Sequence, residues 1–394
     1  MDFDIVIVGG GLAGASLAAA LGDGGQRVAL IERGAPPAPT ADWDSRVYTL
    51  TPASIAFLEG IGAWQRVPAE RVTPIYDMQV LGDDAGSRLN FSAYESGVLS
   101  LGATVESGRV LGALWHGLER QRNLSLICPS APATLRRAGN RVEIGLDLGR
   151  VVTAKLVVGA DGADSWVRQA AGIQVRTRSY DQLGVVANFR CSRPHLNRAY
   201  QWFRGDGVLA FLPLPERRVS IVWSTPRAQA EQLLALSASA LCARVSEASR
   251  GALGELEPLT RPAAFPLARM VSPRMALERV ALIGDSAHVV HPLAGQGINL
   301  GLGDAQWLAD LVGAAPDPGD RMLLRRFERS RAEDILALHW VTHGLFRLFV
   351  TNQPMIRRMR NLGLNLTDAT PVIKSLLTRR AIAVGGGRYR MGAS

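Results

Sequence analysis

Residues 4–21 read DIVIVGGGLAGASLAAAL, and this stretch decides the fold. The apolar run predicts a buried strand, the glycines predict a tight turn, and the Ala/Leu-rich part predicts a helix. Glycines at positions 9, 11 and 14 allow a sharp turn, a backbone that can touch a pyrophosphate, and a helix packed closely on its strand. A pyrophosphate would lie at the helix N-terminus. A glycine-rich turn in another kind of βα unit is the plain alternative.

A carboxylate in the expected place favours the nucleotide-binding interpretation. Residues 27–31 predict a second strand, and Glu32 ends it, eighteen residues beyond Gly14. A carboxylate there can bind both ribose hydroxyls of an adenosine and would repel a 2′-phosphate. Arg33, the next residue, is a further candidate. The unit therefore predicts dinucleotide binding but does not separate NAD from FAD.

Two later segments carry a resemblance. Residues 156–158 predict a strand that runs into GADGADSWVR (159–168), and residues 280–283 predict a strand that runs into GDSAHVVHPLAGQGINLG (284–301). These segments resemble the DG and GD fingerprints of the single-component (class A) flavoprotein aromatic monooxygenases. Within that group the chain is most similar to the ubiquinone-biosynthesis (UbiH-type) FAD-dependent hydroxylases, over residues 1 to about 330.

The resemblance implies FAD as cofactor and O2 as co-substrate. Only one nucleotide fingerprint is found in the sequence, so NADH or NADPH would act as a transient reductant. Together with the glycines and Glu32, the resemblance gives these cofactor-binding candidates: Gly9, Gly11, Gly14, Glu32, Arg33, Arg46, Arg109, Asp161, Gly162, Asp285, Gly295, Gln296, Gly297 and Asn299. Asp161, Gly162 and Arg168 would lie near the pyrophosphate, and Asp285 would hold a ribityl hydroxyl.

Single residues also have plainer interpretations. Asp285 directly follows a strand, which places it where ligands of open α/β sheets bind, but it could instead cap a helix. The chain has only two lysines, Lys155 and Lys374, among 44 basic residues, so Arg46 or Arg109 could simply replace a surface lysine.

Gly295, Gln296 and Gly297 open a predicted helix whose apolar residues recur at three- and four-residue steps: Ile298, Leu302, Ala305, Leu308 and Val312. The resemblance implies that the N-terminus of this helix stabilises the anionic reduced flavin. His291 and Pro292, expected beside the flavin edge, are the catalytic candidates. His288 is expected to be a turn histidine that bonds the backbone. No metal site is expected, because no acidic or cysteine ligand accompanies the two histidines.

Between the fingerprints, residues 184–189, 199–203, 207–212 and 218–224 predict consecutive antiparallel strands, to which residues 72–91 add more. The expected inward positions form an apolar wall or an ordinary core: Val186, Trp202, Phe211, Leu212 and Val222.

We therefore predict an α/β fold with a Rossmann-like FAD-binding domain, an inserted antiparallel β-sheet substrate domain and C-terminal helices. The FAD-binding domain is discontinuous, with residues 1–71, 101–174 and 272–320. The substrate domain takes residues 72–100 and 175–271, and the C-terminal helical region takes residues 321–394.

The resemblance implies a monooxygenase that hydroxylates the aromatic ring of a polyprenylated phenol in ubiquinone biosynthesis, through a flavin C4a-hydroperoxide. Two alternatives stay open: a non-catalytic FAD-binding subunit of a membrane-associated quinone-biosynthesis assembly, and a prenyl-chain reductase of the same fold. A flavin-dependent halogenase would need a catalytic lysine and a Trp-x-Trp motif, and the sequence has no such motif.

Composition and charge limit the classes of protein to which the chain can belong. Of 394 residues, 47% are hydrophobic and 20% charged, which predicts a globular protein. Three cysteines are too few for a disulfide framework and suit a reducing compartment. No stretch predicts a signal peptide or a membrane span. We expect a cytoplasmic protein, able to lie on the inner face of the cytoplasmic membrane.

The positive charge is concentrated at the C-terminal end. Residues 321–394 hold 14 of the 44 basic residues and 4 of the 35 acidic residues. Apolar and basic residues interleave there: Leu345, Phe346, Arg347, Leu348, Phe349, Met355, Ile356, Arg357, Arg358, Met359, Arg360 and Leu362. Such a helix can lie on an anionic membrane or seat a partner, such as another ubiquinone-biosynthesis protein, or can simply cap the core. No motif for nucleic-acid binding accompanies the charge.

Overall fold

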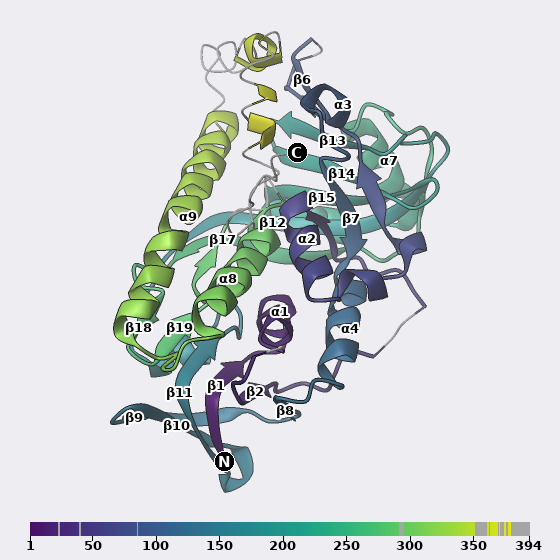
Figure 1. The fold of residues 1–394 in the computed structure, drawn as a ribbon. Coiled ribbons are helices and arrows are strands. Elements are labelled where there is room, and N and C mark those ends of the chain that lie inside the picture. The colour runs from purple at the N-terminus through teal and green to yellow at the C-terminus, as the bar shows by residue number, and fades with distance from the viewer. Residues whose placement is uncertain are drawn as a thin grey trace.

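The computed structural model describes residues 1–22, 24–38, 41–84, 86–290, 295–350, 361, 363–368, 370, 374–375 and 377–379. The described chain forms two large sheets and one small sheet, with helices packed around them (Figure 1).

The first large sheet contains the predicted nucleotide-binding strands. Its order is β18-β19-β11-β1-β2-β8, and β10 and β9 extend it from β11. The strands are β1 (Asp2–Val8), β2 (Val28–Ile31), β8 (Leu124–Ile127), β9 (Pro132–Ala138), β10 (Arg141–Leu146), β11 (Val151–Gly159), β18 (Ala276–Leu277) and β19 (Val280–Leu282). β1 lies between β11 and β2 and is parallel to both. Because both faces of a parallel sheet are covered, Ile5, Val6 and Ile7 are all fully buried.

Small residues let three parts of this region pack closely. The helices here are α1 (Leu12–Ala20), α4 (Ser107–Leu118), α5 (Trp166–Ala170) and α8 (Gly297–Val312). A Cβ added to Gly284 would lie 3.2 Å from the Cβ of Ala13, and one added to Gly301 would lie 3.3 Å from the Cα of Gly284. The end of β19 therefore meets both α1 and α8.

The second large sheet contains the four strands predicted between the fingerprints. Its order is β20-β17-β12-β15-β14-β13-β5-β6, with β16 also on β12. The strands are β5 (Asp77–Leu81), β6 (Arg88–Ser92), β12 (Arg176–Cys191), β13 (Arg198–Arg204), β14 (Gly207–Leu214), β15 (Arg218–Pro226), β16 (Leu256–Pro258), β17 (Ala263–Val271) and β20 (His288–Val289). All pairs are antiparallel except β13 with β5. Helices α6 (Arg227–Ala235) and α7 (Ala238–Ala248) share an apolar core with one face of this sheet.

A three-stranded sheet completes the β structure, with β3 (Val47–Leu50), β7 (Gly102–Glu106) and β4 (Thr73–Ile75). Helix α2 (Pro52–Gly60) follows β3, and the short helix α3 (Ala93–Ser96) follows β6. The predicted fold class is thus confirmed. The domain boundaries stay a prediction, and two strands cross them: β4 belongs to the small sheet, and β20 pairs with β17 of the second large sheet.

In the chain, helix α9 (Arg321–Val350) comes after α8. The described residues beyond α9 include two that bind β6. The backbone N–H of Arg88 donates to Asn365 at 3.1 Å, and that of Asn90 donates to Asp368 at 2.9 Å. The side chains at 345–349 and all of residues 351–360 and 362 lie outside the described part, so the basic amphipathic helix stays a prediction. No helix in the described ranges is both long and apolar enough to span a bilayer.

Candidate functional site

The glycine turn between β1 and α1 is closed on two sides and open on a third. Gly9 has a φ of +106°, and a Cβ there would lie 2.4 Å from the carbonyl oxygen of Ala160. A Cβ at Gly14 would lie 2.0 Å from the carbonyl oxygen of Gly9. A Cβ at Gly11, directly before α1, would meet nothing within 4 Å. The N-terminus of α1 therefore opens onto space that a ligand can enter.

Glu32 lies beside this turn. Its Oε2 accepts a hydrogen bond from the backbone N–H of Gly10 at 2.6 Å, and its Oε1 accepts one from Gly34 at 2.9 Å. The indole of Trp115 donates to the carbonyl oxygen of Gly10 at 2.9 Å and fixes the turn from the other side. Each carboxylate oxygen keeps a further acceptor position for a hydroxyl group. Arg33 follows with an exposed side chain.

The two candidate arginines have different surroundings. Arg46 is exposed, and its positive charge acts to lower the pKa of the Asp285 carboxyl. The Nε of Arg109 lies 3.8 Å from the Oε2 of the buried Glu106. Glu106 also holds Arg71 through two contacts of 2.7 and 2.8 Å. Arg46 is therefore close to a second candidate, while Arg109 belongs to a structural ion-pair cluster.

Asp161 and Gly162 join the ends of β11 and β19. Asp161 accepts hydrogen bonds from the hydroxyls of Ser165 at 2.5 Å and Ser286 at 3.1 Å. The N–H of Gly162 donates to the same Ser286 hydroxyl at 3.1 Å. Arg168 is buried, and its guanidinium donates to the carbonyl oxygen of Ser286 at 2.9 Å. Arg168 therefore braces the two strand ends from inside.

Asp285 has the surroundings of a ligand-binding carboxylate. Asp285 is exposed, whereas its neighbours Gly284 and Ser286 are buried. Loss of surrounding water raises the pKa of Asp285, against the opposing charges of His288 and Arg46. The carboxylate is therefore accessible to a ligand, while protein groups surround it. It is found at the carboxyl end of β19, where ligands of open α/β sheets bind.

The prediction for His288 was wrong, because its partner is a buried carboxylate and not the backbone. The His288 Nε2 lies 2.6 Å from Oδ2 of Asp304, which also accepts from the N–H of Gly284 at 2.9 Å. Oδ1 of Asp304 accepts from the Nε of the fully buried Arg331 at 2.8 Å. Burial acts to raise the pKa of Asp304, but the charges of His288 and Arg331 outweigh it and lower that pKa. This network fixes the backbone directly beside Asp285.

The turn before α8 is held by Asn299. Gly295 has a φ of +60°, and α8 begins at Gly297. Asn299 is fully buried, and its amide donates to the carbonyl oxygen of Thr49 at 3.0 Å and to the side chain of Gln296 at 3.3 Å. Asn299 therefore ties the start of α8 to β3 and supports the turn from below. His291 and Pro292 lie outside the described residues, so their role stays a prediction.

Of the two expectations for these positions, an apolar wall or an ordinary core, the core is confirmed for Trp202 and Phe211. The five residues divide between two faces of the second sheet: Trp202 and Phe211 on one, and Val186, Leu212 and Val222 on the other. The rings of Trp202 and Phe211 pack edge to face at 4.9 Å, in the core shared with α6 and α7. The other face is turned toward the segment just before β3, because the amide of Asn188 donates to the carbonyl oxygen of Asp44 at 2.9 Å. Alternation alone does not reveal which face a helix covers.

Phe265 lies on the same face of the second sheet as Val186. It pairs with Gly184 in the register of β17 and β12, and Val186 pairs with Val222 on the same face. The Phe265 side chain is 40% exposed, and a Cβ at Gly184 would lie 2.8 Å from its ring. The ring therefore lies across Gly184 and leaves part of its apolar surface exposed.

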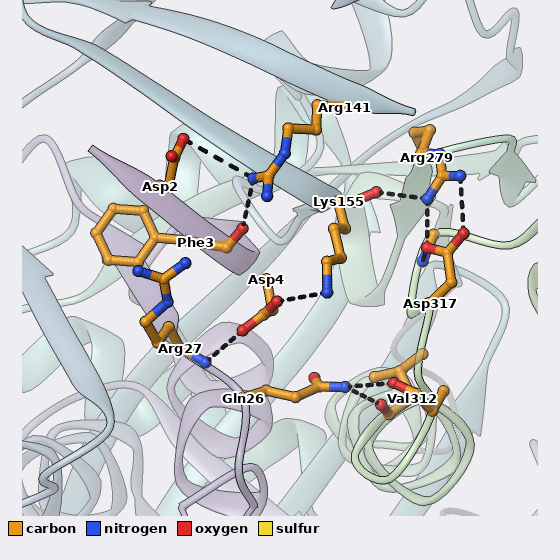
Figure 2. Close-up of polar contacts among 12 residues, drawn as sticks. Asp2, Phe3, Asp4, Gln26, Arg27, Arg141, Lys155, Arg279, Val312 and Asp317 are labelled. Atoms are coloured by element: carbon orange, nitrogen blue, oxygen red, sulfur yellow. Dashed lines mark hydrogen bonds and ion pairs between the residues drawn. The ribbon is translucent and has the colours of Figure 1, made fainter. Parts of the chain in front are cut away.

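Lys155 lies on β11, toward the end of the parallel strands that is opposite the glycine turn. Figure 2 shows its ammonium bound to Asp4, at 2.9 Å. Lys155 is four residues before Gly159, the last residue of β11. A strand advances roughly 3.3 Å per residue, so Lys155 is about 13 Å from the carboxyl end. Lys155 is therefore too far from the expected ligand site to serve as the catalytic lysine of a halogenase.

Several important residues were missed in the sequence. Asp304 is a charged residue on the buried face of α8, and this exception to the apolar pattern was the available signal. Ser286, Glu106 and Arg331 gave no comparable signal, because each acts on residues far away in the chain.

Three comparisons with known proteins agree with this geometry. The family model described as "FAD binding domain" matches residues 2–99 and 133–338. The chain is 34% identical over 387 residues to the 3-demethoxyubiquinol 3-hydroxylase of Escherichia coli (strain K12), covering 97% of this chain and 98% of that protein. It is 35% identical to the ubiquinone hydroxylase UbiL of Rhodospirillum rubrum, covering 96% and 89%. The structure of P. aeruginosa PqsL in complex with 2-aminobenzoylacetate matches with a TM-score of 0.77 and 25% identity, covering 93% and 100%.

Proposed function

This chain belongs to the FAD-binding domain family, and we propose that it is an FAD-dependent monooxygenase that hydroxylates the aromatic ring of a polyprenylated phenol in ubiquinone biosynthesis. The observation that carries the proposal is near-full-length similarity to proteins named as ubiquinone hydroxylases. The open glycine turn and the exposed Asp285, both at the carboxyl edge of one sheet, support it independently of those names.

The residues fit FAD. Gly9, Gly11 and Gly14 would let the N-terminus of α1 bind the pyrophosphate, and Glu32 would accept hydrogen bonds from the adenosine ribose. Asp285 would accept one from a ribityl hydroxyl. The support is chemical: a Cβ at Gly11 would meet nothing within 4 Å, and Asp285 is an exposed carboxylate that accepts no hydrogen bond from the described residues.

Other candidates have supporting roles in this proposal. Arg46, exposed and near Asp285, and Arg33, exposed after Glu32, would contact phosphate or ribose. Asp161 and Gly162 would shape the pyrophosphate side, and Arg109 would act through Glu106. The turn formed by residues 295–297, supported by Asn299, would present the N-terminus of α8 to the flavin ring.

When bound, FAD supplies the activation of O2, after reduction by NADH or NADPH as a transient reductant. The chain must hold the phenol ring against the flavin edge and exclude water. Val186, Val222 and Phe265 would form the apolar side of that space. His291 and Pro292 would lie at the flavin edge and contact the reacting groups.

A polyprenylated phenol resides in the bilayer, so the enzyme would collect it at a membrane. We propose a cytoplasmic protein that lies on the inner face of the cytoplasmic membrane through its basic C-terminal residues, alone or with other ubiquinone-biosynthesis proteins. The excess of basic over acidic residues in 321–394 supports this.

The test is turnover by the purified, FAD-loaded protein with NADH or NADPH, O2 and a short-chain demethoxyubiquinol. A ring-hydroxylated product supports the proposal. A reduced prenyl chain formed without O2 would instead indicate a prenyl reductase. Intact FAD without any turnover, together with restored ubiquinone in a deletion strain, would indicate a non-catalytic subunit.

A further inference from the structure

A hollow on the first sheet is surrounded by arginines. It has a volume of about 220 Å³ and is lined by Arg137, Arg274, Ala276, Leu277, Glu278, Arg321, Leu324 and Arg325. The four arginines come from three places: β9, the segment just before β18, and the first two turns of α9. Four exposed arginines from separate parts of the chain therefore line the hollow, with Glu278 as the one acidic residue among its lining residues.

These arginines have no acidic partner in the part of the chain that the structure describes, whereas their neighbours do. Arg136, next to Arg137 on β9, lies 2.6 Å from Glu143. Arg279, next to Glu278, is paired with Asp317. Like charges gathered in one hollow repel each other unless an anion joins them. The pattern is therefore that of a site for a negatively charged ligand.

The elements that carry the arginines are fixed to each other. Figure 2 shows the guanidinium of Arg279 bound to Asp317, at 2.8 Å for one of its two contacts. The backbone N–H of Arg279 donates to the carbonyl oxygen of Gly319 at 3.1 Å, just before α9 begins. The N–H of Met275 donates to Glu328 on α9 at 2.8 Å. These contacts therefore fix the backbone that carries Arg274, Arg321 and Arg325 before any ligand binds.

We propose that this hollow binds a phosphate-bearing anion through Arg137, Arg274, Arg321 and Arg325. Arginine forks match phosphate oxygens in geometry and charge. The volume corresponds to about seven water molecules at roughly 30 Å³ each, so the hollow has room for a diphosphate group. The phosphate belongs either to a free phosphorylated compound or to a lipid headgroup.

The hollow is separate from the proposed FAD site. It adjoins Arg279, which precedes β19, whereas Asp285 follows that strand. The two sites therefore lie toward opposite ends of the parallel strands, and the inference does not depend on the hydroxylase proposal.

The test is calorimetric titration of the FAD-loaded protein with inorganic pyrophosphate. The double variant Arg321→Glu/Arg325→Glu changes the hollow. The matched control Arg326→Glu/Arg329→Glu makes the same charge change on exposed residues of the same helix, outside the hollow. We expect the hollow variant to bind at least tenfold more weakly than wild type and control, and added salt to weaken all binding.

Equal affinity in the two double variants, or no binding by the wild type, would overturn the proposal. The single variant Arg137→Ala provides a second reading from another element and should bind at least threefold more weakly. The visible absorbance of bound FAD shows in each case that the fold and the flavin site are intact, so failure here is distinguishable from failure of the proposed function.

Vesicles identify the source of the phosphate. Sedimentation is compared for phosphatidylcholine vesicles with and without phosphatidylglycerol. If the hollow variant alone loses binding to the anionic vesicles, the ligand is a lipid headgroup. If all three proteins sediment alike while the difference for pyrophosphate persists, the ligand is a free phosphorylated compound.

Discussion

Replacing Gly11 with alanine should weaken FAD binding without harming the fold. A Cβ there meets nothing within 4 Å, so the free energy of unfolding of the apoprotein should fall by only about 0.5–1 kcal/mol, the cost of alanine at a helix N-cap. The new methyl group would stand where a pyrophosphate must approach the backbone. A lost hydrogen bond to a charged group costs about 1.5–3 kcal/mol, so FAD affinity should fall about tenfold to a hundredfold.

The comparison variant is Gly14→Ala, whose Cβ would lie 2.0 Å from the carbonyl oxygen of Gly9. It should lower the free energy of unfolding of the apoprotein by about 1–3 kcal/mol or more, because the backbone must shift. Urea denaturation of both apoproteins measures stability, and quenching of flavin fluorescence measures FAD affinity. Normal FAD affinity in the Gly11 variant would refute the placement of the pyrophosphate over this turn.

Three further changes test other parts of the account. Asp285→Asn should lower FAD affinity at least tenfold without destabilising the apoprotein at pH 7. Folding raises the pKa of Asp285, so the stability that its proton confers is lost as pH rises through that pKa. Asparagine resembles the protonated form and therefore should not lower the free energy of unfolding at pH 7. Loss of apoprotein stability in urea would contradict this. Asp304→Asn leaves Arg331 buried without its main counter-charge, and the free energy of unfolding should fall by about 3–5 kcal/mol. Because folding lowers the pKa of Asp304, the wild type should lose this contribution as pH falls below about 3.8, and a variant with an unchanged acid profile would argue against it. Phe265→Ala should raise KM for the phenol about fivefold and leave FAD affinity unchanged, and steady-state kinetics with an unaltered KM would remove Phe265 from the substrate space.

Local features were predictable because their signals are local. Gly9, Gly14 and Glu32 lie within one βαβ unit, so their spacing alone predicted that they lie around the same turn. The four middle strands were visible from alternation and turn residues. Asp285 was placed at a strand end for the same reason.

Long-range features were not predictable from the sequence. His288 forms a hydrogen bond with Asp304 on α8, which accepts another from Arg331 on α9, and no residue near His288 in the chain predicts these contacts. The face on which Trp202 packs depends on where α6 and α7 lie, which strand alternation does not reveal. The parallel pairing of β13 with β5 likewise joins segments more than a hundred residues apart.

Heavy-oxygen labelling tests the central claim most directly. The FAD-loaded protein is given reductant, a short-chain demethoxyubiquinol and isotopically labelled O2, and the product is analysed by mass spectrometry. The account predicts one labelled oxygen atom on the aromatic ring of each product molecule. A product whose new oxygen comes from water, or consumption of O2 with no oxygen on the ring, would contradict it.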